Sequence, residues 1–378
     1  MTNPLGNRKT RNFALQALFL AIIGAMVVTA VVTARRNLQI QGVTVGWDFL
    51  HYTTGVSLTF TLIPYDITST FAQALLVGIV NTLLLGGISV PLAVVLGTLI
   101  GTARLSSNRM LSWIASWYIQ LFRNLPLILQ AFFWYTLVTH LPPPRRAISL
   151  PGDVFISNRG VFLPILNVDL AHVASAIAII LLSVLGSILV SSLVSKAWGR
   201  TAFGTGLLLS VAVLWVGWQP GAPLFDFPTL HGLKFVGGGT IVPELTAAIT
   251  AISLFGASYV AEIVRSGFLA IPSGQIEAAH ALGLRDWAIF WKIKLPLMIR
   301  IVLPTMTNQI IWLMKATTIG IAIGFTDFFA AIAMAINNTG QTLSLIFILI
   351  IGFWIINMTI SVVMNSINRA IAIPGRKS

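Results

Sequence analysis

The sequence predicts an all-α membrane protein, a polytopic bundle of about eight transmembrane helices. Of the 378 residues, 56% are hydrophobic and only 9% are charged, whereas a soluble protein carries roughly 25% charged residues. The mean hydropathy of +0.90 agrees with lipid as the solvent for most of the chain. No cysteine is present, which excludes disulfides, thiolate metal sites and cysteine nucleophiles.

Eight apolar runs supply the expected helices, since a hydrocarbon core of about 30 Å needs roughly 20 helical residues. The runs are 13–32, 71–100, 111–139, 172–194, 203–218, 242–264, 301–323 and 343–363. Basic residues precede the first run and small residues end it, which also fits a cleaved signal peptide. Its length and the seven runs that follow favour a retained helix.

The basic residues predict how these helices are oriented. With the N-terminus inside, 15 of the 23 Lys and Arg fall in inner segments and six in outer segments, which leaves Arg123 and Lys315 within spans. This bias predicts that both termini and the loop 265–300 are cytoplasmic. Because the basic residues are dispersed among short loops, the net charge of +13 does not indicate nucleic-acid binding.

The runs divide the chain into five regions. Residues 1–70 are an N-terminal transmembrane helix with an outer segment, and 71–139 are the first part of a core. Residues 140–240 are an insert with two transmembrane helices and outer loops, whose Pro- and Gly-rich stretches predict turns. Residues 241–369 complete the core, and 370–378 are a cytoplasmic tail.

Two pairs of glycines predict close helix contacts, because a small-xxx-small pattern lets backbones approach each other in lipid. Gly97 and Gly101 form one pair, and Gly320 and Gly324 form the other. Chance in a glycine-rich membrane protein explains the pairs equally well.

The stretch EAAHALGLRDWAIFWKIKLP, residues 277–296, is polar between long apolar runs. Ser273 can cap a helix, Gly283 can take a positive φ at its end, and Asp286 can cap a second helix. Pro296 is expected to end that second helix or interrupt its hydrogen bonds. The segment therefore predicts a helix, a glycine corner and a second helix, which either seats a soluble partner or only connects two spans.

This stretch resembles the EAA signature of bacterial ABC importer permeases. The matching residues are Glu277-Ala278-Ala279, Gly283 and Ile293-Lys294-Leu295-Pro296, at the spacing of that family. LFRNLPL from residue 121, AEIVRSG from 261 and the LP, NQ and LMK groups between 303 and 315 resemble the polar amino-acid (histidine, glutamate, glutamine and arginine) permeases. The insert, with PGDVFISNRGVFLP, resembles the permeases of general L-amino-acid and of glutamate/glutamine/aspartate/asparagine importers. Ala316-Thr317-Thr318 departs from the family, where an Asp or Asn and a Ser often follow the lysine.

The resemblance implies a type I ABC importer permease fold in the bacterial inner membrane and import of polar L-amino acids by alternating access. It implies an ATPase-coupling role for Glu277, Ala278, Ala279, Gly283, Leu284 and Pro296. The implied partners are a cytoplasmic ABC ATPase dimer, a second related permease or a second copy, and a periplasmic amino-acid-binding protein; no nucleic acid is expected.

The chain itself is expected to be a transporter subunit and not an enzyme. No lysine follows a glycine, so the phosphate loop GxxxxGK[ST] is absent. ATP and magnesium are therefore expected on the partner ATPase, with no cofactor or metal on this chain. An ion-gradient-driven secondary transporter or channel is the alternative, and it leaves the EAA stretch unexplained.

Polar residues within the apolar runs are candidates for a substrate pathway, because charges at membrane depth are costly and mark function. The candidates are Asn81, Arg123, Glu262, Asn308 and Lys315. An amino-acid zwitterion needs both a cation and an anion, so Arg123 or Lys315 is expected to meet its carboxylate and Glu262 its ammonium. The alternative is that these groups pair with each other: Glu262 and Arg265 share a helix face. A bend at Pro126 would instead bring Arg123 to the membrane interface.

Overall fold

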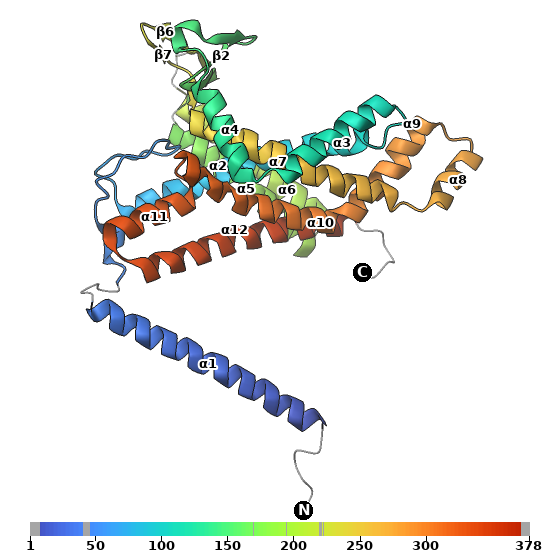
Figure 1. Cartoon of the computed structure of the whole chain (residues 1–378). Helices are drawn as coiled ribbons and strands as arrows, with labels where there is room; N and C mark the ends of the chain where they lie inside the picture. Colours follow the sequence, from blue (N-terminus) through green and yellow to red (C-terminus); the bar gives the residue numbers. More distant parts are fainter. Residues whose placement is uncertain are drawn as a thin grey trace, which may run out of the picture.

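The computed structural model describes residues 8–40, 46–168, 170–193, 195–218, 221 and 223–371. Figure 1 shows a bundle of long helices, with strands gathered at the top and the short helices α8 and α9 projecting at the right. The helices are α1 (Arg8–Ile40), α2 (Phe71–Ala103), α3 (Arg109–Asn124), α4 (Leu127–Thr139), α5 (Leu170–Leu193), α6 (Lys196–Gly217), α7 (Pro243–Leu269), α8 (Ser273–Ala281), α9 (Asp286–Ile289), α10 (Leu295–Ala316), α11 (Phe328–Thr339) and α12 (Thr342–Ile371). The predicted tail lies outside the described residues from position 372 onward.

The chain is a multi-pass membrane protein. Among the described residues, six helical segments are long and apolar enough to cross a membrane: α1, α2, α6, α7, α12 and the segment Asp286–Ile323, which contains α10. The helices α3 and α4 pass the same test only as a pair that is bent by 104° at its break, the geometry of a broken span or of a re-entrant loop. The remaining expected span, 172–194, coincides with α5, whose side chains are described only in part.

The core lies between α2, α4, α7 and α10, and the contact between α2 and α7 is the most extensive one between any two helices. A Cβ atom on Gly97 would lie 2.5 Å from the Cβ of Val260, and one on Gly101 would lie 2.5 Å from the carbonyl oxygen of Ala261. Any side chain at these positions would push the helices apart. The first predicted glycine pair is therefore confirmed.

The seventh apolar run does not form one continuous α-helix. α10 ends at Ala316 and continues as a 3-10 helix, Thr317–Ile323. Gly324 then adopts a φ of 84°, and the Asp327 side chain caps the start of α11. The predicted contact through Gly320 and Gly324 is wrong, because these two residues close a turn instead of pairing two helices.

Two parts of the chain lie beside the core. No residue in the apolar window of α1 is buried, and Figure 1 shows α1 apart from the bundle. The helices α5 and α6 pack closely on each other, since a Cβ on Gly206 would lie 2.1 Å from the Cβ of Ser183. The insert thus contributes a helical hairpin whose main contact is internal.

The predicted helical membrane bundle is confirmed, and short strands occur in the loops that connect its helices. An antiparallel sheet has the order β1 (Ile148–Leu150), β2 (Val154–Ser157), β3 (Gly160–Leu163) and β8 (Gly239–Ile241). Two further pairs are β4 (Ile165–Leu166) with β5 (Phe225–Asp226) and β6 (Thr229–His231) with β7 (Lys234–Val236). Gly152, at a φ of 84°, allows the tight turn between β1 and β2, so the predicted turns join strands.

Candidate functional site

The predicted cytoplasmic loop folds as two short helices with a glycine corner. Gly283 adopts a φ of 73° directly after α8. Its N–H donates to the carbonyl of His280 at 2.9 Å, and the N–H of Leu284 donates to that of Ala279 at 3.1 Å. This pair of bonds is a Schellman motif, which satisfies the last carbonyl groups of the helix. The backbone at Gly283 therefore fixes the direction of the corner.

The helix ends in this loop differ from the prediction. Ser273 and Asp286 are the first residues of α8 and α9; the cap positions belong to the preceding residues, and no side-chain cap hydrogen bond forms there. Pro296 does not end the second helix, because the chain continues through a π-helix, Phe290–Lys294, into α10. Pro296 stands in the first turn of α10, directly after the π-helix.

The two faces of α8 differ in exposure. Ala279 is 2% exposed, whereas Leu282 beside the corner is 81% exposed and Trp287 on α9 is 72% exposed. Glu277 and Ala278 are exposed as well. A carboxylate and large apolar side chains thus stand together at the tip of the molecule, and exposed apolar surface of this kind marks an interaction site.

The loop is anchored to the helices on both sides of it. Ile271, which follows α7, and Met298 on α10 are buried in one apolar cluster. The rings of Phe268 and Phe290 stack with their centroids 5.9 Å apart. The loop is therefore fixed to α7 at one end and to α10 at the other.

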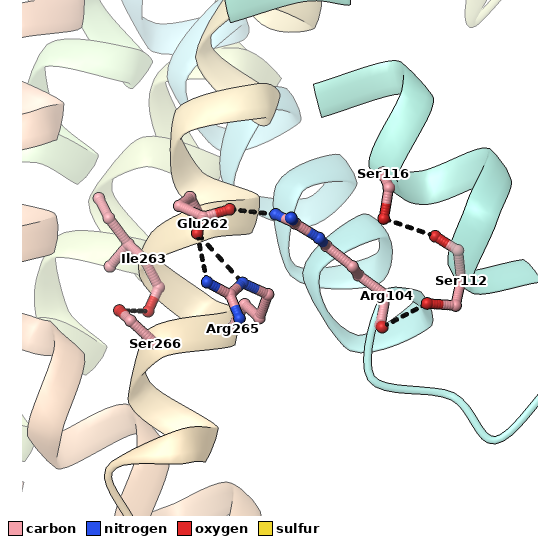
Figure 2. A network of polar contacts seen from close by, with 7 residues as sticks. All are labelled: Arg104, Ser112, Ser116, Glu262, Ile263, Arg265 and Ser266. Carbon is pink, nitrogen blue, oxygen red and sulfur yellow. Dashed lines mark hydrogen bonds and ion pairs between the residues drawn. The ribbon is translucent and has the colours of Figure 1, made fainter. Parts of the chain in front are cut away.

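Glu262 on α7 is bound by two arginines. Figure 2 shows its carboxylate between Arg104 and Arg265: Oε1 accepts from Nη2 of Arg265 at 2.6 Å, and Oε2 accepts from Nη1 of Arg104. The carbonyl of Arg104 accepts a hydrogen bond from Oγ of Ser112 at 2.8 Å, which ties the end of α2 to α3. The predicted pairing of Glu262 with Arg265 is confirmed by this geometry.

A cavity of about 350 Å³ adjoins this network. Its lining comes from α3, α7 and the turn after α2: Arg104, Ile119, Gln120, Arg123, Asn124, Tyr259 and Glu262. Two of the predicted pathway residues, Arg123 and Glu262, therefore line the same cavity. The guanidinium carbon of Arg123 lies 5.0 Å from the centre of the Tyr259 ring, within cation–π range.

Asn308 and Lys315 lie on an exposed face of α10, with Trp312 between them. Their spacing of four and three residues places all three on one side of the helix. The Trp312 ring lies 5.6 Å from that of Phe255 and 6.2 Å from that of Tyr259, so aromatic rings connect this face to the cavity wall. Lys315 stands in the last turn of α10, within the apolar helical segment that continues to Ile323.

Asn81 lies elsewhere, on α2, and is fully buried. Its side-chain amide donates to the carbonyls of Phe60 at 3.0 Å and Thr326 at 2.8 Å. It thus ties α2 to the outer segment and to the turn before α11. Asn81 is not among the residues that line the cavity, so its predicted pathway role stays a prediction.

Reasoning from the sequence does not identify five residues that line the cavity: Arg104, Ile119, Gln120, Asn124 and Tyr259. It also misses Trp312, whose ring lies beside that of Tyr259. One signal was present, because polar residues recur at helical spacing along α3: Ser112, Ser116, Gln120 and Arg123. Tyr259 and Trp312 give no such signal, since aromatic residues in an apolar run occur as often in a packed core as in a binding site.

Comparison with known proteins identifies the family. The family of binding-protein-dependent transport system inner membrane components matches residues 93–373. The chain is 35% identical over 352 residues to the putative amino-acid ABC transporter permease protein YhdX of Escherichia coli, covering 90% of this chain and 88% of that protein. It is 33% identical to the general L-amino acid transport system permease protein AapQ of Rhizobium johnstonii, covering 97% and 94%.

A solved structure of an amino acid ABC transporter aligns with a TM-score of 0.48 and 19% identity, over 79% of this chain and 95% of that chain. The family match covers well over half of the chain, and the identity to YhdX extends along most of both proteins. The chain therefore belongs to the binding-protein-dependent transport system inner membrane components, the multi-pass permease subunits of ABC transporters.

Proposed function

We propose that this chain is the permease subunit of an ABC importer that moves polar L-amino acids into the cytoplasm by alternating access. Relatives named as amino-acid ABC permeases support the substrate class. The observation that carries the proposal is the exposed corner of α8, Gly283 and α9, anchored at one end to α7 and at the other to α10.

The corner is the contact for a cytoplasmic ATPase dimer. Glu277, Ala278 and the exposed side chains near Gly283 meet the ATPase, while Ala279 and Leu284 hold the corner and Pro296 begins the helix that receives the motion. ATP and magnesium bind the ATPase. Because a ligand shifts an equilibrium only through its different affinity for the two states, nucleotide-driven closure of the ATPase favours one tilt of α7 and α10 over the other.

A second permease subunit, related or identical, covers the exposed face of α10. A charged side chain facing lipid is costly, so the exposure of Asn308 and Lys315 supports a protein or water-filled surface opposite this face. Arg123 and Glu262 contribute to the substrate pathway, and Asn81 supports it by holding α2 in place. Both termini are cytoplasmic, and a periplasmic binding protein delivers the amino acid from the outer side.

The test is to replace Gly283 by proline in the complete transporter. Proline fixes φ near −65°, whereas the corner requires 73°, so the Schellman motif cannot form. We expect loss of ATPase co-purification in mild detergent and loss of ATP-driven amino-acid uptake, with normal insertion into the membrane.

The matched control is Gly152→Pro, since Gly152 also has a positive φ, 84°, but lies between two outer strands. This variant should retain the ATPase. Normal docking in the Gly283→Pro variant would show that the corner is not the coupling element. If the wild-type chain purified without any ATPase and its uptake survived ATP depletion, the importer function itself would be refuted.

A further inference from the structure

We propose that the cavity between α2, α3 and α7 binds the carboxylate groups of the substrate and favours anionic over cationic amino acids. The inference rests on the importer function proposed above and adds the charge class of the cargo. It begins from the balance of charge at the cavity.

The cavity carries an excess of positive charge. Arg104 and Arg123 line it, Arg265 is bonded to its wall, and Glu262 is the one acidic residue among the lining residues. Three cations against one anion leave a net charge of +2. Charges interact more strongly where they are partly shielded from water, as the side chains of Arg104, Arg265 and Glu262 are, so this excess attracts an anion and repels a cation.

Glu262 is already engaged on both carboxylate oxygens, one by Arg104 and the other by Arg265. A substrate ammonium arriving at Glu262 would have to compete with two guanidinium groups. The role of Glu262 as the ammonium partner, expected from the sequence, is therefore not supported by this geometry, and Glu262 acts instead to orient Arg104.

Arg123 is the cation that remains for a ligand. Its side chain is exposed at the cavity, and its neighbour is the ring of Tyr259, 5.0 Å away. No ion pair to Arg123 occurs within the described part of the chain. A guanidinium group presents paired N–H donors that match a carboxylate, which makes Arg123 the anchor of the substrate carboxylate.

Polar side chains of α3 extend the site along one helix face. Gln120 and Asn124 line the cavity beside Arg123, and Ser112 and Ser116 continue the same face toward the start of the helix. Trp113, on another face, is 67% exposed. The amides of Gln120 and Asn124 can donate to a second carboxylate or accept from an ammonium, as an acidic amino acid requires.

An anionic lipid headgroup would share the chemistry of an anion at a basic pocket. The observations favour an amino acid, because the volume of about 350 Å³ is at the lower end of small-molecule sites and aromatic rings join the cavity to the face of α10. The experiment separates the two sources.

The experiment measures equilibrium binding of radiolabelled L-glutamate, L-glutamine and L-arginine to the complete permease–ATPase complex in phosphatidylcholine nanodiscs without binding protein. We expect glutamate to bind at least about 10-fold more tightly than arginine. Arg123→Gln should weaken glutamate binding by about 10- to 100-fold, the range for a lost charged hydrogen bond. Arg123→Lys, which keeps the charge, should retain part of the affinity, and Arg123→Glu should favour arginine.

The control is Arg109→Gln, which removes an exposed arginine of α3 outside the cavity and should leave glutamate binding unchanged. Equal affinity for glutamate and arginine, or unchanged binding in Arg123→Gln, overturns the inference. So does a phosphatidylglycerol that co-purifies with the wild type, is lost in Arg123→Gln and blocks glutamate. In each of these cases ATP-driven uptake of neutral amino acids would persist, whereas failure of the importer function would abolish all uptake.

Discussion

At the scale of single residues, the carboxylate of Glu262 is shared by two guanidinium groups. The side chains of Arg104, Glu262 and Arg265 are 24%, 28% and 29% exposed. The pairs are therefore intermediate between surface ion pairs, which contribute at most about 1 kcal/mol, and buried ones, whose disruption costs about 3–5 kcal/mol. Loss of the acid would leave two like charges facing each other.

We expect Glu262→Gln to lower the free energy of unfolding by about 1–3 kcal/mol, since both arginines lose their counterion while partly shielded from water. Thermal unfolding of the purified complex in detergent would show a lower midpoint. Asp48→Asn removes an exposed carboxylate far from this network in the sequence and should leave the midpoint unchanged. Equal midpoints in both variants and the wild type would mean that the network contributes nothing to stability.

Single residues also show where sequence reasoning stops. Arg123 and Glu262 stand out because each is a charge within an apolar run. Arg104 follows the second run, and a cation outside an apolar run gives no sign of function because it stays in water at no cost. Its pairing with Glu262, 158 positions away, becomes visible only in the folded structure. In the sequence Trp312 resembles a core residue. In the structure it is 44% exposed and lies on the same face of α10 as Lys315.

At the scale of elements, the close approach of α2 and α7 determines the core. The carbonyl oxygen of Ala261 would stand 2.5 Å from a Cβ on Gly101, and backbone cannot move away as a flexible side chain can. Glycine at this position is therefore a requirement of the helix pair. Gly87 on the same helix is different, because a Cβ there would have no neighbour within 4 Å.

We expect Gly101→Val to destabilise the protein by at least about 1–3 kcal/mol, the usual cost of overpacking. Gly87→Val introduces the same side chain into the same helix and should be tolerated. Size-exclusion chromatography and thermal unfolding of the two variants would measure the difference. If both variants behaved like the wild type, the close helix contact would not be essential.

The elements also divide into predictable and unpredictable ones. The glycine corner was predictable because only a positive φ at Gly283 allows a turn of that length. The bend of 104° between α3 and α4 was not, since both limbs are apolar and Pro126 leaves the angle open. Across the bend, Gln130, which is 4% exposed, donates to the carbonyls of Phe122 and Leu125 at 2.9 and 3.0 Å, contacts that form only once the chain has folded.

At the scale of the whole molecule, hydropathy and charge bias predict the bundle because every crossing segment needs an apolar run of sufficient length. The sheet of β1, β2, β3 and β8 cannot be predicted from hydropathy or charge bias. Its strands are three or four residues long and stand among prolines and glycines, so they show too little periodicity to be separated from turns.

The orientation of the whole chain can be tested directly, because the sequence has no cysteine and a single introduced thiol has no background. In cells with a permeabilised outer membrane, a membrane-impermeant maleimide should label Ser149→Cys on β1 and leave Ser273→Cys on α8 unlabelled. After lysis both should react. The reverse labelling pattern before lysis would contradict the positive-inside orientation.

The corner between α3 and α4 has a mechanical consequence. The side-chain amide of Gln130 hydrogen-bonds across the break between α3 and α4. We therefore expect the two helices to move together, as the two arms of one bent unit. One arm leads through residues 140–147 to β1, and the other carries Gln120 and Arg123. We expect a force applied at β1 to reach α3 through α4 and to change the wall of the cavity, while the contact between α2 and α7 stays in place.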